Sequence, residues 1–103
     1  MPSIEQLQKL LAADPTDAFL LYGLAQEHAR LGNHAEAVRC YDRCLAADPA
    51  YAYAYFHKAR AQEAAGDTAA AAATLRAGIA AARAAADSHA LSEISAYLDE
   101  LTP

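Results

Sequence analysis

The chain has 103 residues, enough for one domain that buries about two-thirds of the surface exposed by its unfolded form. Its net charge of −5 is spread along the whole length and its eight basic residues form no cluster, so it lacks the positive stripe that binding to a phosphate backbone needs. No run of about 20 strongly apolar residues is present and the first residues do not resemble a secretion signal, so we expect no nucleic-acid partner, no membrane association and a cytoplasmic location.

The first two helices are predicted from caps and apolar spacing. Ser3 and Gln6 have the spacing of a capping box, and the apolar residues that follow predict a helix that ends near Ala13. After an Asp-Pro turn, Thr16 or Asp17 is expected to cap a second helix. The predicted buried stripe of that helix consists of Leu20, Leu21, Leu24, Ala25 and His28.

A glycine separates the second helix from the third. The second helix is expected to end at about Leu31, because Gly32 allows a left-handed backbone. Asn33 and Glu36 have the spacing of another capping box and predict the start of the third helix. That helix is expected to close at the Asp-Pro step of residues 48–49.

The second half of the chain predicts three more helices, rich in alanine. A fourth helix is expected from about Tyr51 to Ala65, and a fifth from about Thr68 to Ala86. A sixth begins at Asp87 or Ser88 and carries a single apolar stripe with a polar back, which suits the end of a stack. The stripe consists of Leu91, Ile94, Leu98 and Leu101.

The chain contains an internal repeat. The letters Leu-Ala-Ala-Asp-Pro occur at residues 11–15 and again at 45–49, a shift of 34 residues that also aligns Gly32 with Gly66. A period of this length is typical of arrays of helical hairpins.

The repeated residues closely resemble the tetratricopeptide repeat (TPR), as in small TPR proteins of bacterial type. The matching residues of the first full unit are Leu21, Leu24, Ala25, His28, Gly32, Asn33, Ala37, Tyr41, Cys44 and Pro49. The second unit is degenerate, because Lys58, Gln62 and Arg83 stand where the family has an apolar residue, an aromatic residue and a proline.

This resemblance implies an all-α, right-handed superhelical stack of antiparallel helix hairpins, an α-solenoid of about six helices. It divides a single domain, residues 1–103, into an N-terminal half-repeat helix at 3–14, repeat one at 16–49, a degenerate repeat two at 50–86 and a capping helix at 87–101. It also implies a module that binds a protein or peptide on its concave face. We expect this module to be non-enzymatic, to need no cofactor and to be a monomer or weak homodimer.

Helical geometry predicts which side chains line that face. If the apolar stripes pack inside the hairpins, the residues turned toward the groove are Phe19, Tyr22, Gln26, Tyr53, Phe56, His57, Arg60 and Glu63. We expect an apolar or aromatic peptide, or a partner helix, across the rings, with Arg60 available to one acidic group. An alternative is that some of the rings pack under neighbouring helices. Tyr22 and Gln26 occupy two positions where chaperone-tail receptors of the family hold a carboxylate, which disfavours that role.

Two other readings compete with partner binding. The aromatic surface could serve as a homodimer interface in a structural protein. Cys40 and Cys44 could bind a metal with His34, although their spacing is not a usual ligand pattern and core packing accounts for both. Four residues apart on a helix, the two thiols are too distant for a disulfide and are expected to be reduced. No nucleophile–base pair indicates an enzyme.

Lys58 poses a separate question, because the family usually buries this position and an unpaired buried lysine is costly. We expect the last helix either to leave this position partly hydrated or to offer a carboxylate, with Glu93 and Asp99 as the candidates.

Overall fold

A computed structural model describes residues 2–103. Residue 1, which the predicted domain includes, lies outside the described residues. The described residues form six helices and no strand. The helices are α1 (Ile4–Ala13), α2 (Ala18–Arg30), α3 (His34–Ala47), α4 (Ala52–Ala64), α5 (Thr68–Ala84) and α6 (Ser88–Leu101). None of these helices is long and apolar enough to cross a membrane.

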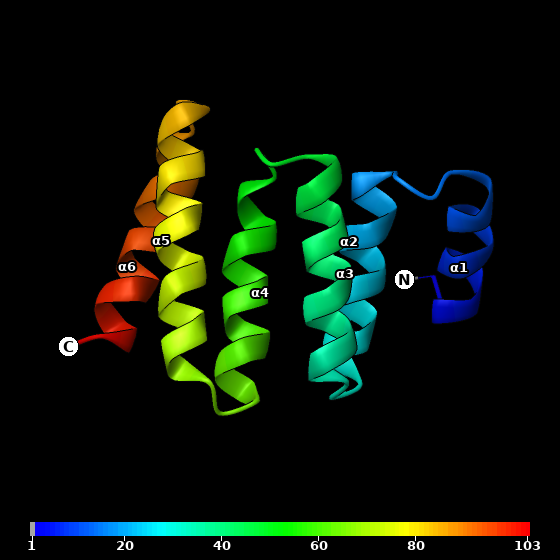
Figure 1. Ribbon diagram of the computed structural model, residues 1–103, viewed down its shortest axis with the longest axis horizontal. Coiled ribbons are helices and arrows are strands. Elements are labelled where there is room, and N and C mark those ends of the chain that lie inside the picture. Colours follow the sequence, from blue (N-terminus) through cyan, green and yellow to red (C-terminus); the bar gives the residue numbers. More distant parts are fainter. Residues whose placement is uncertain (1) are drawn as a thin grey trace.

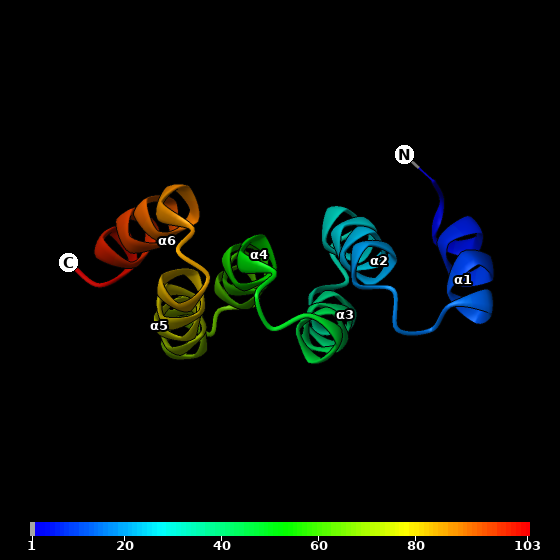
Figure 2. The same cartoon turned by 90° about the horizontal axis from the view of Figure 1, so that it is seen from above.

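The helices form a solenoid with two layers. Figure 1 shows them standing side by side from α1 to α6, and Figure 2 shows α2, α4 and α6 in one layer, with α3 and α5 in the other. Within the described residues, α2 contacts α4 and α4 contacts α6, whereas α3 and α5 do not contact each other. The stack is therefore narrower on the side of α2, α4 and α6, which we call the inner face. The predicted all-α solenoid is confirmed.

Most helix ends form as the sequence predicts. Ser3 and Gln6 make both hydrogen bonds of a capping box, and Asp17 rather than Thr16 caps α2 by accepting from the backbone of Leu20. The capping box predicted at Asn33 is wrong. Its side chain makes no cap hydrogen bond and instead lies 3.4 Å from the imidazole of His28.

The chain reverses through left-handed residues after α2, α4 and α5. Gly32 and Gly66 have φ angles of 80° and 88°, values that side chains disfavour. Ala86, at the corresponding place before α6, also has a positive φ of 54° although it carries a Cβ. All three lie directly before the N-cap residue of the next helix.

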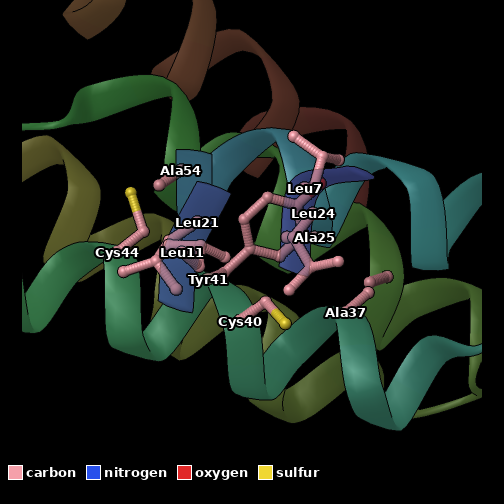
Figure 3. Close-up of a cluster of buried hydrophobic side chains, with 11 residues drawn as sticks. Leu7, Leu11, Leu21, Leu24, Ala25, Ala37, Cys40, Tyr41, Cys44 and Ala54 are labelled. Atoms are coloured by element: carbon pink, nitrogen blue, oxygen red, sulfur yellow. The ribbon is translucent and has the colours of Figure 1, made fainter. Parts of the chain in front are cut away.

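The first hydrophobic core joins α1, α2, α3 and α4 around Tyr41, the largest fully buried side chain (Figure 3). Its buried members are Leu7, Leu11, Leu21, Leu24, Ala25, Ala37, Cys40, Tyr41, Cys44, Ala54 and Ala61. His28, predicted in this stripe, is only half-buried. Cys40 and Cys44 are free thiols in this core, as expected, and burial raises the pKa of Cys44 to about 11.

The second core has much smaller side chains. Its buried members are Ala52, Ala59, Ala71, Leu75, Ala82, Ala90 and Ile94, from α4, α5 and α6. Gly78 on α5 lets the helices come close, because a Cβ there would lie 2.7 Å from the Cβ of Tyr55 on α4. The small side chains of α4 and α5 therefore allow these helices to pack closely, with the Tyr55 side chain directly over Gly78.

The prediction that Glu93 or Asp99 on α6 pairs with Lys58 is wrong. Its ammonium lies 2.6 Å from the carboxylate of Asp42 on α3. The reason is helical spacing, because Lys58 lies between Ala54 and Ala61, four and three residues away, and both belong to the core that packs on α3. Lys58 therefore faces the preceding hairpin, away from α6.

Replacing Gly78 by alanine tests the close approach of α4 and α5. The added methyl group must displace Tyr55, so we expect the free energy of unfolding to fall by about 1–3 kcal/mol, despite the better helix propensity of alanine. Gly23→Ala is the matched control, because the nearest atom to its new Cβ is a Leu7 methyl at 3.7 Å, an ordinary contact. It should be neutral or gain up to about 1 kcal/mol. Equal stability of the two variants in urea denaturation would contradict this packing.

Lys58→Leu tests the ion pair with Asp42. The carboxylate of Asp42 is 52% exposed, so it stays hydrated when its partner is removed. We expect the stability at neutral pH to change by less than about 1 kcal/mol or to rise, as for other exposed pairs. A much larger loss at neutral pH that disappears in acid would show that the Asp42 carboxylate depends on Lys58.

Candidate functional site

Two pockets follow one another along the inner face. The first has a volume of about 440 Å³ and lies between α2, α3 and α4. Its lining consists of Gln26, Glu27, Ala29, Arg30, His34, Tyr41, His57, Arg60, Ala61 and Ala64. Among these lining residues, Tyr41 is the one aromatic side chain that belongs to the first hydrophobic core.

The second pocket has a volume of about 340 Å³ and lies between α4 and α6. Its lining consists of Phe56, Arg60, Glu63, Glu93, Ala96, Tyr97 and Glu100. Arg60 belongs to both pockets. The two pockets therefore form one groove, which crosses α4 at Arg60.

An ion pair between a buried carboxylate and an exposed arginine forms one wall of the first pocket. The carboxylate of Glu27 is 6% exposed and accepts hydrogen bonds from Arg30 Nε and Nη2 at 3.2 and 3.0 Å. These bonds lower the pKa of Glu27. The charge of Arg30 is therefore already paired. Arg60 also lines the groove, and its guanidinium forms no ion pair with any residue of 2–103.

Aromatic contacts hold the floor of the groove. The ring of Tyr22 lies 4.9 Å from Tyr51, 5.9 Å from Tyr41 and 5.8 Å from His57, measured between ring centroids. This packing leaves Tyr22 half-buried, and burial raises its pKa to about 12. Phe19, one turn earlier on α2, is 72% exposed.

A second aromatic contact lies in the second pocket. The rings of Phe56 and Tyr97 are 5.2 Å apart, and the hydroxyl of Tyr97 donates a hydrogen bond of 2.6 Å to Glu63. Burial and this bond both raise the pKa of Tyr97. The contact holds the last helix against α4, and both rings line the second pocket.

The structure brings together only part of the predicted groove. Gln26, His57 and Arg60 line the first pocket, while Phe56 and Glu63 join Arg60 in the second. Three predicted rings line neither pocket: Phe19 is exposed, and Tyr22 and Tyr53 are half-buried against the cores. The residues that sequence reasoning missed are Glu27, Arg30, His34, Glu93, Tyr97 and Glu100.

The residues considered for a metal do not share a site. His34 lines the first pocket, whereas Cys40 lines a depression between α1, α2 and α3 on the other side of the core. Within residues 2–103, no three His, Cys, Asp or Glu side chains come together in a way that could hold a metal ion.

Comparison with known proteins places the repeats in a family. Two family profiles described as tetratricopeptide repeat match residues 18–51 and 53–77. A TPR repeat-containing protein of Pseudomonas aeruginosa is 33% identical over 98 residues, which cover 95% of this chain and 93% of that protein. The chain belongs to the tetratricopeptide repeat family.

Solved TPR structures have the same architecture. A TPR domain protein from Salinibacter ruber is 31% identical and superposes with a TM-score of 0.79, over 86% of this chain and 90% of that one. PcrH, solved in complex with the chaperone binding region of PopD, is 25% identical, with a TM-score of 0.88 over 96% of this chain and 75% of that one.

The two pockets occupy corresponding positions along the stack. The N-cap residues of α2 and α4 are 34 residues apart, whereas those of α4 and α6 are 36 apart. A shift of 36 residues converts the α4 lining of the first pocket into the α6 lining of the second. The paired positions are 57 and 93, 60 and 96, 61 and 97, and 64 and 100. Aligning α6 with α4 at a shift of 36 residues, instead of 34, would therefore have pointed to Glu93, Tyr97 and Glu100.

His57 gives this TPR domain a testable pH dependence. Burial, and then the nearby charge of Arg60, lower the pKa of His57 in the folded protein. As the pH falls below about 6.5, the unfolded chain takes up this proton first, so the folded state loses stability through that window. We expect His57→Gln to reduce the loss, as measured by urea denaturation between neutral and mildly acidic pH. His89→Gln, which changes a 77% exposed ring, should not reduce it. Equal slopes for wild type and His57→Gln would contradict this assignment.

Proposed function

We propose that the protein is a non-enzymatic interaction module that binds a segment of a partner protein in the groove across α2, α4 and α6. The observation that carries the proposal is the pair of adjoining pockets, which have core aromatic rings beneath them and hydrogen-bonding side chains at their rims. Partner-binding surfaces commonly combine an aromatic centre with a polar rim.

The related complex supports the same mode of action. PcrH was solved with a region of PopD, so a protein of this architecture binds a segment of another protein. The exposed ring of Phe19 lies one turn before Tyr22 on α2 and offers further apolar area beside the first pocket. An apolar or aromatic peptide, or one helix of a partner, is the occupant that this surface favours.

Filling the groove tests the proposal without removing any core packing. Ala64 and Ala96 are exposed helical residues that line the first and second pockets. We expect the double variant Ala64→Gln/Ala96→Gln to weaken capture of partner proteins from native extract by at least about tenfold, a change of about 1.4 kcal/mol. Helix propensity differs little between the two residues, so the fold should be retained.

The matched control is Ala46→Gln/Ala73→Gln, which makes the same change at exposed positions of α3 and α5 outside the groove. It should capture the same partners as the wild type. Unchanged capture by the groove-filling variant would contradict the proposal. If filling the groove instead alters the oligomeric state measured by light scattering, the surface is a homodimer interface.

A further inference from the structure

The two halves of the groove differ in charge. In the first pocket Glu27 pairs with Arg30, which leaves the exposed guanidinium of Arg60 as the unpaired charge. The second pocket is lined by the same arginine and by three carboxylates, those of Glu63, Glu93 and Glu100. Glu63 accepts a hydrogen bond from Tyr97, and Glu93 lies 2.7 Å from the exposed ring of His89. The groove therefore changes from cationic to acidic as it passes from the α2 side of α4 to the α6 side.

An unsatisfied nitrogen also points to a ligand in the first pocket. The Nδ1 atom of His34 is buried and makes no hydrogen bond to any residue in the described chain. Its residue lines the first pocket together with Arg60 and Gln26. Buried polar atoms without a partner are rare and costly in folded proteins. A polar group bound in this pocket can supply the missing hydrogen bond.

We propose that the groove selects a partner segment that carries an acidic side chain and, about three residues away, a basic side chain. The acidic group binds in the first pocket at Arg60, and the basic group binds in the second pocket. For a segment bound in an extended conformation, the spacing follows from geometry, because neighbouring helices lie about 10 Å apart and an extended chain advances about 3.3 Å per residue. This inference rests on the proposed function and adds the chemistry of the occupant.

Each pocket suits its charge. A guanidinium can hold a carboxylate through two parallel hydrogen bonds, and Gln26 is a further donor in the same pocket. In the second pocket, a lysine or arginine side chain would meet the carboxylates beside the apolar rings of Phe56 and Tyr97. A wholly apolar segment would remove these charges from water without pairing them, and a phosphate chain would be repelled by the three carboxylates.

Selection from a random peptide library displayed on phage, with the whole protein immobilised, tests the proposal. We expect the enriched peptides to carry Asp or Glu about three residues from Lys or Arg, next to an apolar or aromatic residue. A synthetic version of the best peptide with its acidic residue changed to an amide should bind about tenfold more weakly, and so should a version with its basic residue changed to Gln. Fluorescence anisotropy at low and high salt provides the affinities.

Variants of the protein assign each charge to a pocket. Arg60→Gln should abolish the preference for the acidic residue and retain the preference for the basic one, whereas Glu93→Gln/Glu100→Gln should do the reverse. Arg76→Gln and Asp99→Asn change exposed charges outside both pockets and should leave both preferences intact.

Two results would overturn the charge selection. Enrichment of peptides without paired opposite charges would contradict it and leave binding in the groove standing. Failure to enrich any peptide would also contradict it, because the selecting charges are present in the protein used. The proposed function is judged separately, by capture with the groove-filling variant. If the groove-filling variant loses capture but the peptide library shows no preference for charged residues, the groove binds its partner without regard to charge.

Discussion

The contact between Gly78 and Tyr55 sets the distance between α4 and α5, and the second half of the solenoid depends on it. With a Cβ position only 2.7 Å from the Tyr55 side chain, no other residue fits without movement of the helices. The buried alanines above and below this contact require the same small separation. On other sides of α4, Ala54 and Ala61 pack against the first core, while His57 and Arg60 line the groove.

The length of α5 determines the chemistry of the second pocket. It has 17 residues where α3 has 14, because Arg83 allows the helix to continue where the first repeat has a proline. Even with a shorter turn, α6 then starts two residues later than the repeat period requires. Glu93 consequently takes the place that His57 has in the first pocket, and an alanine takes that of Arg60. The difference in charge between the pockets follows from this shift.

The sequence predicts the helices well because caps, glycine turns and apolar spacing are local signals. It predicts less of the groove, because the side chains that line the groove depend on which helix packs against each face of α2, α4 and α6. Lys58 could not be placed from the consensus alone, because its partner depends on the stripe that Ala54 and Ala61 share with α3. Tyr97 was missed for a different reason: it lies on α6, which is offset by two residues from the 34-residue period.

The contrast between the two cores makes the solenoid uneven in its local stability. Leucines and Tyr41 fill the first core, whereas the second relies on alanines with one leucine and one isoleucine. Fewer large side chains are buried there, and Ala86 holds a backbone conformation that a Cβ disfavours. We therefore expect the α5–α6 unit to open at a lower free-energy cost than the α2–α3 unit, with faster amide exchange. A segment that spans the groove would bind this unit to the firmer half and slow its opening.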